Sequence, residues 1–147
     1  MTESSSAADD SIGVLICDDV ESMRFLLRLT IELHEGERGL RVIGEARDGN
    51  EAIAEAERLQ PDVIVLDLSM PHRTGLDALP EIKHVAPDAK IIVLSAFASS
   101  TIAADVLAHG ADRYMEKGAA PSAISGAIEE VAARAHAGQP QNLSPAA

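Results

Sequence analysis

The sequence predicts an α/β fold in which an open parallel sheet carries helices on both faces. Three observations lead to this prediction. Short apolar runs alternate five times with longer segments that have helical periodicity. Three of the runs are almost continuously apolar, which is typical of strands covered on both faces. Right-handed crossovers between successive parallel strands then place the helices on the two faces of one sheet.

Five segments are expected to form the strands. The most apolar runs read IGVLIC, VIVLDL and KIIVL and show no alternation of apolar and polar residues. The run LRVIGEA is weaker, and RYME is too short to predict alone; the order of the other elements requires a strand there. The predicted strands are Ile12–Cys17, Leu40–Ala46, Val63–Leu68, Lys90–Leu94 and Arg113–Glu116.

Helical segments separate these strands, and each places apolar residues three and four positions apart. Met23, Leu26, Leu27 and Ile31 have this spacing in the first of them. Gly110 suits the end of the fourth helix, and Pro121 suits the start of the fifth. The predicted helices are Ser22–Leu33, Glu51–Leu59, Gly75–Val85, Ser100–Ala108 and Ser122–Ala135.

The 147 residues are expected to form one domain with a tail at each end. Residues 1–10 are small, polar and acidic, so we expect a flexible tail there. Residues 11–136 hold all the predicted elements. Residues 137–147 contain Gly138, Pro140 and Pro145, so we expect them to end the last helix and form a linker or tail.

Composition excludes several kinds of function. The chain has 12 Lys and Arg against 24 Asp and Glu, a formal net charge of −12, which argues against direct binding to nucleic acid or to an anionic membrane. The single cysteine, Cys17, allows no intrachain disulfide and no cysteine-rich zinc site. No apolar run approaches the roughly 18 residues of a membrane-spanning helix, so we expect a cytoplasmic protein.

Residues able to do chemistry follow four of the five predicted strands. Asp18 and Asp19 follow the first strand, Asp67 lies at the end of the third, and Ser95 and Lys117 follow the fourth and fifth. The carboxyl ends of parallel strands meet at one edge of a sheet, where ligands bind in such folds. Three carboxylates brought together there repel one another unless a cation is present. Mg²⁺ prefers oxygen ligands of this kind and is the expected cofactor.

This set of residues suits phosphoryl transfer. A carboxylate such as Asp67 can attack phosphorus, Lys117 can neutralise a phosphoryl oxygen, and Ser95 can donate a hydrogen bond to another. Each residue alone has a simpler interpretation. Asp18 and Asp19 are suited to helix capping, Asp67 to a turn, Ser95 is common at strand ends, and lysines such as Lys117 are mostly solvated surface charges. The combination is what predicts a functional site.

From about Ile12 to Ala135 the sequence resembles the receiver domain of two-component response regulators. The residues that carry the resemblance are Asp18-Asp19, the stretch VLDLSMP at residues 65–71 followed by Gly75, Ser95-Ala96, Gly110-Ala111 and the run Tyr114–Lys117. The resemblance implies the CheY-like, flavodoxin-like doubly wound fold, with five strands in the order 2-1-3-4-5 and five helices.

The resemblance also implies roles at the acidic edge. Asp67 would be the phosphoacceptor. Asp19 would ligate Mg²⁺ directly, Asp18 would act largely through water, and the backbone carbonyl of Ser69 would complete the protein ligands together with Asp67.

A second set of implied roles concerns switching. Ser95 would bind the phosphoryl group and move toward it, Lys117 would pair with the phosphoryl oxygens, and Tyr114 would alternate between exposed and buried rotamers. An apolar ring at Phe97, two residues beyond Ser95, is expected to shield the acyl phosphate from water.

Four features depart from the commonest receiver pattern. Gly118 follows Lys117 where many receivers have proline; this is similar to the NarL-type branch, whose receivers usually precede a helix-turn-helix DNA-binding domain. Ser95 stands where threonine is commoner and keeps the hydroxyl, and the loop Glu35–Gly39 is longer than usual. Asn142-Leu143-Ser144-Pro145 looks like the opening of such a DNA-binding domain, and the alternatives are a stand-alone receiver, a chain cut at the linker, or an unstructured tail.

The function expected from the resemblance is a phosphorylation-controlled switch that catalyses only its own phosphotransfer and autodephosphorylation. Its expected partners are a sensor histidine kinase or phosphotransfer protein, a downstream protein target, and a second copy bound through the region Ser99–Lys117. Three alternatives stay open. They are the receiver half of a NarL-type DNA-binding regulator, a pseudo-receiver that is never phosphorylated, and an aspartate-nucleophile phosphatase, in which Ser69 would replace a second aspartate.

Overall fold

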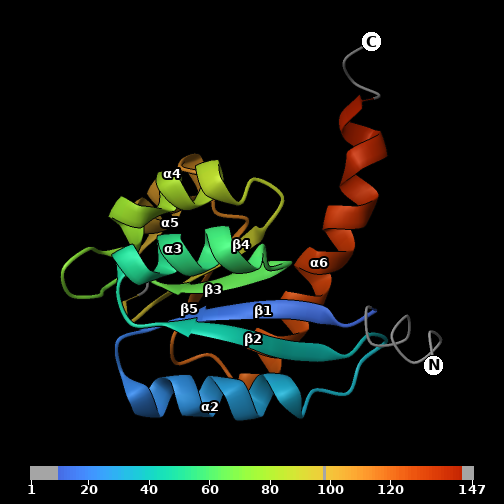
Figure 1. Cartoon of the computed structure of the whole chain (residues 1–147), viewed down its shortest axis with the longest axis horizontal. Coiled ribbons are helices and arrows are strands. Elements are labelled where there is room, and N and C mark those ends of the chain that lie inside the picture. The colour runs from blue at the N-terminus through green and yellow to red at the C-terminus, as the bar shows by residue number, and fades with distance from the viewer. Residues whose placement is uncertain (1–9, 98, 144–147) are drawn as a thin grey trace.

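A five-stranded parallel sheet lies between two layers of helices in the computed structural model, which describes residues 10–97 and 99–143 (Figure 1). The strand order is β2-β1-β3-β4-β5, so the predicted order is confirmed. The strands are β1 Ile12–Cys17, β2 Leu40–Ala46, β3 Val63–Asp67, β4 Lys90–Ser95 and β5 Arg113–Glu116. Compared with the predicted bounds, β3 ends one residue earlier and β4 ends one residue later. As a result, Asp67 and Ser95 are the last residues of their strands.

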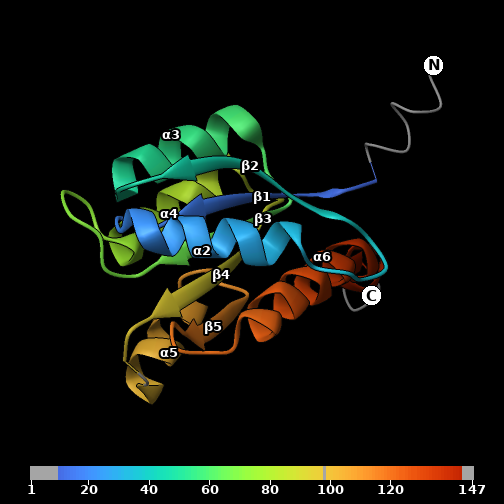
Figure 2. The ribbon, with the colours of Figure 1, turned by 90° about the horizontal axis from the view of Figure 1, so that it is seen from below.

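Two helices cover one face of the sheet and three cover the other. On one side are α2 Glu21–Glu32 and α6 Pro121–Leu143. Figure 2, seen from below, shows α2 in front of the sheet. On the other side are α3 Gly49–Leu59, α4 Gly75–Val85 and α5 Ser100–Ala108. Within the described part of the chain, no helix has both the length and the apolar character needed to cross a membrane.

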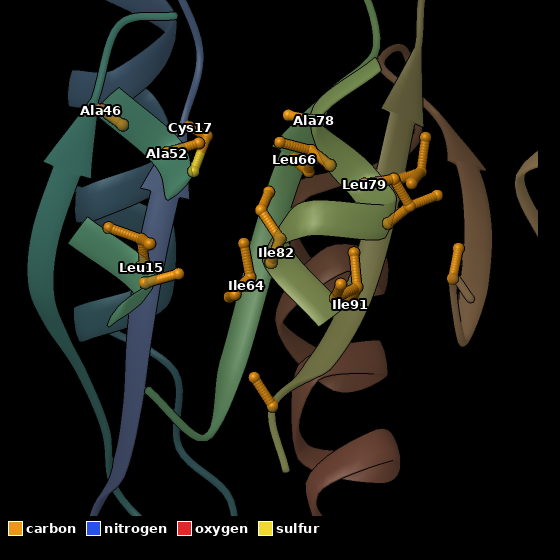
Figure 3. Packing of buried hydrophobic residues seen from close by; sticks show 14 of the residues in the cluster. Leu15, Cys17, Ala46, Ala52, Ile64, Leu66, Ala78, Leu79, Ile82 and Ile91 are labelled. Carbon is orange, nitrogen blue, oxygen red and sulfur yellow. The ribbon is translucent and has the colours of Figure 1, made fainter. Parts of the chain in front are cut away.

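The central strands are continuously apolar because both of their faces are buried. Successive residues of a strand point to opposite faces, so Val65 packs against the α2 and α6 layer while Leu66 packs against α3 and α4. Figure 3 shows the second layer, where Ile82 of α4 lies over Ile64 and Ile91. Burial on both faces stabilises these strands, so the residues at their carboxyl ends are held on a stable support.

The predicted end of the last helix is wrong. We expected residues 137–147 to form a linker or tail, but α6 continues through Gly138 and Pro140 to Leu143. Alanine has the highest helix propensity, and this segment is rich in it, with four alanines between Ala132 and Ala137. Pro140 lies in the last turn of α6, where it removes one backbone hydrogen bond. The remainder of the predicted tails, residues 1–9 and 144–147, lies outside the described residues.

The unusually long loop Glu35–Gly39 is held by α6. The carboxylate of Glu129 accepts hydrogen bonds from the backbone amides of Glu37 at 2.8 Å and Arg38 at 3.4 Å. Its other oxygen lies 2.8 Å from Nε2 of His34, at the end of α2. One side chain of α6 therefore fixes both the end of α2 and the chain that leads to β2.

We expect Glu129→Gln to have a lower melting temperature than the wild type at neutral pH. In acid the two proteins should have the same melting temperature. The hydrogen bonds from His34 and from the Glu37 and Arg38 amides hold the pKa of Glu129 below its ordinary value of 4.5. A carboxylate with a lowered pKa stabilises the fold above that ordinary value, and this contribution disappears as pH falls through the lowered pKa. Thermal unfolding from neutral pH to about pH 3 measures both effects.

Glu130→Gln is the matched control, because Glu130 is exposed and pairs with Arg113 at the surface. Its replacement should change the unfolding free energy by less than about 0.5 kcal/mol. Equal melting temperatures for the two variants at neutral pH would show that Glu129 does not hold the loop.

Candidate functional site

Three carboxylates gather where β1 and β3 end. Asp18 and Asp19 directly follow β1, and Asp67 is the last residue of β3. The two strands are neighbours, with Cys17 paired to Leu66, so the carboxylates meet although they are far apart in sequence. One ligand atom from each of the three residues lies within 4.8 Å of the other two. Asp18 and Asp67 are buried, whereas Asp19 is exposed.

Lys117 places a positive charge between the two buried carboxylates. Its Nζ lies 3.1 Å from Oδ2 of Asp18 and 3.1 Å from Oδ2 of Asp67. The backbone amide of Lys117 donates a hydrogen bond to the carbonyl of Ser95 at 2.8 Å, which fixes the start of the side chain. The Lys117 side chain is only 22% exposed, so the interpretation as a solvated surface charge is wrong.

The remaining hydrogen bonds of the two buried carboxylates are local. Oδ1 of Asp18 accepts from the amide of Val20 at 2.9 Å, and Oδ1 of Asp67 accepts from the amide of Ser69 at 3.2 Å. Val20 is the N-cap of α2, and no side chain caps that helix, so the capping interpretation of Asp18 and Asp19 is also wrong. Among the described residues, the two Oδ2 atoms have no well-aligned hydrogen-bond donor, although both are within ion-pair distance of Lys117.

Burial and repulsion disfavour the charged form of Asp67. Desolvation raises the pKa of Asp67 above its ordinary value of 3.8, the charge of Asp18 raises it further, and Lys117 opposes both effects. For Lys117, burial acts to lower the pKa, but Asp18 and Asp67 outweigh it and raise the pKa above 10.5. The ammonium group therefore stays charged, and one cation serves two carboxylates.

The donor set fits a hard divalent cation. Two buried carboxylate oxygens without an aligned donor, together with the exposed carboxylate of Asp19, offer negative oxygen ligands from one side. Mg²⁺ takes one or two carboxylates and keeps several waters, which requires a site open to solvent on the other side. The cluster could therefore hold a metal ion of this class.

Ser95 and Tyr114 lie beside each other, but neither hydrogen-bonds to Asp67 among the described contacts. Oγ of Ser95 donates to the backbone carbonyl of Phe97 at 3.1 Å, and the hydroxyl of Tyr114 donates to the same carbonyl at 2.7 Å. The Phe97 residue is 75% exposed. The predicted switch residues thus share one acceptor in the loop after β4.

The loop that follows Asp67 closes through two glycines. A Cβ atom at Gly75 would lie 2.2 Å from the backbone carbonyl oxygen of Asp67, so only glycine allows α4 to start this close to the end of β3. At Gly49, a Cβ atom would lie 2.5 Å from the carbonyl oxygen of Arg73, and the Gly49 amide donates to that oxygen at 2.8 Å. Gly75 was part of the sequence pattern, whereas the role of Gly49 was not foreseen.

Sequence reasoning also missed a contact behind the site. Nη1 of Arg24 donates to the backbone carbonyl of Asp18 at 2.8 Å, and its Nε donates to Glu45 at 2.9 Å. The available signal was a pair of arginines, Arg24 and Arg28, one helical turn apart and facing the edge strand.

Comparison with protein families identifies the family. The model of the response regulator receiver domain matches residues 14–129. The chain belongs to this family. In this receiver domain the acidic cluster, the lysine and the hydroxyl residue lie at or directly after the carboxyl ends of β1, β3, β4 and β5.

Individual relatives agree with this assignment. The chemotaxis protein CheY of Thermotoga maritima is 36% identical over 118 residues, which are 80% of this chain and 95% of CheY. The response regulator UvrY of Escherichia coli is 37% identical over 120 residues, 82% of this chain but 54% of UvrY. The receiver domain therefore spans nearly all of one relative and about half of another.

Solved structures agree as well. The response regulator domain of Thermotoga maritima CheB superposes with a TM-score of 0.73 at 30% identity, covering 85% of this chain and 96% of that domain. A two-component response regulator of the LuxR family from Aurantimonas superposes with a TM-score of 0.77 at 28% identity, covering 84% of this chain and 86% of that one. Among the described residues of the receiver domain all peptide bonds are trans, including the one that joins Lys117 to Gly118.

We expect Asp67→Asn to raise the melting temperature of the metal-free receiver domain at neutral pH by about 2 °C or more. The raised pKa of Asp67 means that its ionised form destabilises the fold, because burial and Asp18 outweigh Lys117. The destabilisation is present above the raised pKa and disappears as pH falls below 3.8, so the two proteins should converge in acid. Thermal unfolding in EDTA measures the difference, and a lower melting temperature for the variant at neutral pH would contradict this account.

Proposed function

We propose that Asp67 accepts a phosphoryl group and that the receiver domain is a phosphorylation-controlled switch. The observation that carries the proposal is the contact of Lys117 with both buried carboxylates at 3.1 Å, beside the exposed Asp19. A phosphoryl group on Asp67 brings new negative oxygens to a point where an ammonium group is already fixed. Catalysis of phosphoryl transfer depends chiefly on such positioning and charge neutralisation.

The proposed transfer begins with phosphohistidine on a partner protein. A carboxylate oxygen of Asp67 attacks the phosphorus atom, a phosphorus–oxygen bond forms, and the phosphorus–nitrogen bond breaks. The imidazole, which is protonated on its other ring nitrogen, leaves with the bonding electron pair and so becomes neutral histidine. Lys117 stays beside the transferred group and neutralises part of its charge.

Four residues would hold Mg²⁺ at the site. They are Asp18, Asp19, Asp67 and, through its backbone carbonyl, Ser69. When bound, the ion supplies positive charge to phosphoryl oxygens and offsets the repulsion among the carboxylates. The buried oxygens of Asp18 and Asp67 that lack an aligned donor support this assignment.

Switching would act through the carbonyl of Phe97. Ser95 donates its hydroxyl hydrogen to that carbonyl, and a phosphoryl oxygen on Asp67 is a stronger, charged acceptor. We propose that Ser95 turns to the phosphoryl group, which changes the loop that Tyr114 also contacts. The phosphoryl group then shifts the population between two arrangements of the last strands and helices. Shielding of the acyl phosphate by Phe97 stays a prediction.

We propose that the phosphoryl donor is a histidine kinase or phosphotransfer protein and that the domain is cytoplasmic. Beyond its own phosphotransfer and autodephosphorylation, the domain would act through contacts with a downstream protein. The region Ser99–Lys117 is proposed for that contact and for pairing with a second copy; Leu107 in α5 is exposed there.

A second candidate function is the receiver part of a DNA-binding regulator. The match covers 54% of UvrY, so that response regulator contains about as much chain again beyond its receiver domain. The solved structure of a DNA-binding response regulator of the LuxR family from Staphylococcus aureus also superposes on this chain, with a TM-score of 0.73 at 26% identity, and the match covers 98% of that solved chain. A pseudo-receiver is the less favoured alternative because Asp18, Asp67 and Lys117 form an intact cluster. Membership of the receiver family favours the switch over an aspartate-nucleophile phosphatase.

Incubation with acetyl phosphate and Mg²⁺ tests the proposed function. The intact protein should gain the mass of one phosphoryl group, and the amide spectrum should change around Ser95 and Tyr114. Asp67→Asn should gain no mass, whereas the control Asp88→Asn, at an exposed turn between α4 and β4, should behave as wild type. No gain of mass in the wild type, or an equal gain in Asp67→Asn, would refute the proposal.

A further inference from the structure

Arg24 connects the acidic site to the edge strand of the sheet. Its side chain is 11% exposed, although arginine is mostly found at the surface. The guanidinium donates from Nη1 to the carbonyl of Asp18 at 2.8 Å and from Nε to Oε1 of Glu45 at 2.9 Å. The planar guanidinium holds its donors in a fixed fork, so the two contacts fix the position of one group relative to the other.

Glu45 is held in place by the edge strand and by a second arginine. In β2, Val42 pairs with Val14 and Gly44 pairs with Leu15, which leaves Ile43 without a partner in a β-bulge. A bulge redirects the side chains that follow it, and Glu45 is the second residue after Ile43.

The second arginine is Arg28, whose Nε donates to the Glu45 carboxylate at 3.0 Å. Burial acts to raise the pKa of Glu45, but hydrogen bonds from Arg28 and Arg24 outweigh it and lower the pKa, so Glu45 stays a carboxylate. Arg24 therefore has a charged acceptor that is fixed to the sheet.

The hydrogen bond from Arg24 is the third that holds Asp18 in place. Its backbone amide donates to the carbonyl of Ala46 at 3.0 Å, and its side chain accepts from the Val20 amide at 2.9 Å. Arg24 holds the remaining backbone group, the carbonyl that belongs to the peptide joining Asp18 to Asp19. Because that peptide is planar, a fixed carbonyl also fixes the direction in which Asp19 continues the chain.

We propose that Arg24 is a positioning residue for the acidic site. Together with Glu45 it forms a brace, defined as the chain of contacts from Glu45 through Arg24 to the Asp18 carbonyl. The brace holds Asp18 and Asp19 close to Asp67 against the mutual repulsion of the three carboxylates, so the ligand atoms are in place before a cation binds. The inference rests on the proposed function only in taking Mg²⁺ as the cation.

Arg28 separates this role from general stabilisation. It lies one helical turn from Arg24 and binds the same carboxylate, but it has no contact with Asp18 among the described hydrogen bonds. Replacing either arginine removes a salt bridge to Glu45, whereas only the replacement of Arg24 releases the Asp18 carbonyl. The two methionine variants, Arg24→Met and Arg28→Met, are therefore a matched pair.

Titration of the full chain with MgCl₂ in a calorimeter tests the brace. We expect Arg24→Met to bind Mg²⁺ about 10-fold more weakly than wild type, since residues that orient metal ligands contribute about 10–100-fold to affinity. Arg28→Met should stay within about 2-fold of wild type, because it leaves the ligands in place. A second readout needs no metal: in EDTA, the amide resonance of Asp19 should shift in Arg24→Met and not in Arg28→Met.

If Arg24→Met does not fold, Arg24→Lys and Arg28→Lys replace the pair. A lysine is a point charge that reaches one acceptor at a time, so Arg24→Lys should weaken Mg²⁺ binding and Arg28→Lys should not. Equal affinities within either pair would overturn the brace while leaving phosphorylation of Asp67 intact. A wild-type protein that binds no Mg²⁺ would instead overturn the proposed function, and the brace with it.

Discussion

The repulsion between two buried carboxylates is the constraint on which the rest of this structure depends. Asp18 and Asp67 are buried, and a carboxylate oxygen of one lies within 4.8 Å of a carboxylate oxygen of the other. Both carboxylates contact the same ammonium group, that of Lys117. Burial and repulsion raise the pKa of Asp67, so the ionised site is destabilising in the absence of a further cation. Such a site persists only when the surrounding fold holds its members in place.

The parallel sheet meets this requirement. The neighbouring strands β1 and β3 bring Asp18 and Asp67 together, and β4 and β5 bring Ser95 and Lys117 to the same edge. Two apolar layers bury these strands from both sides, so the strand ends are rigid where the charges meet. Glycines at positions 49 and 75 then allow the loop after Asp67 to close against its neighbours. Lys117, which contacts Asp67 through its side chain, is joined through its backbone to Ser95, the last residue before the loop after β4.

The sequence predicted those parts of the structure that depend on local pattern. Continuous apolar runs indicated strands buried on both faces, and charged residues directly after those runs indicated the acidic edge. Sequence spacing does not show the contact of Arg24 with Glu45 or the contacts of Glu129, because packing of α2 against β2, and of α6 against the loop before β2, brings these residues together. The extended α6 was missed because a glycine and two prolines were given more weight than the alanines before them. The Ser95 hydrogen bond to Phe97 depends on loop geometry that no spacing encodes.

The central claim is that the fold holds carboxylates together whose repulsion a divalent cation relieves. Urea unfolding of the wild-type chain at increasing MgCl₂ tests it most directly, with NaCl at equal ionic strength as the reference. We predict that the unfolding free energy rises with Mg²⁺, reaching about 2.7 kcal/mol of added stability at one hundred times the dissociation constant. An unfolding free energy that rises no more in MgCl₂ than in NaCl would contradict the account.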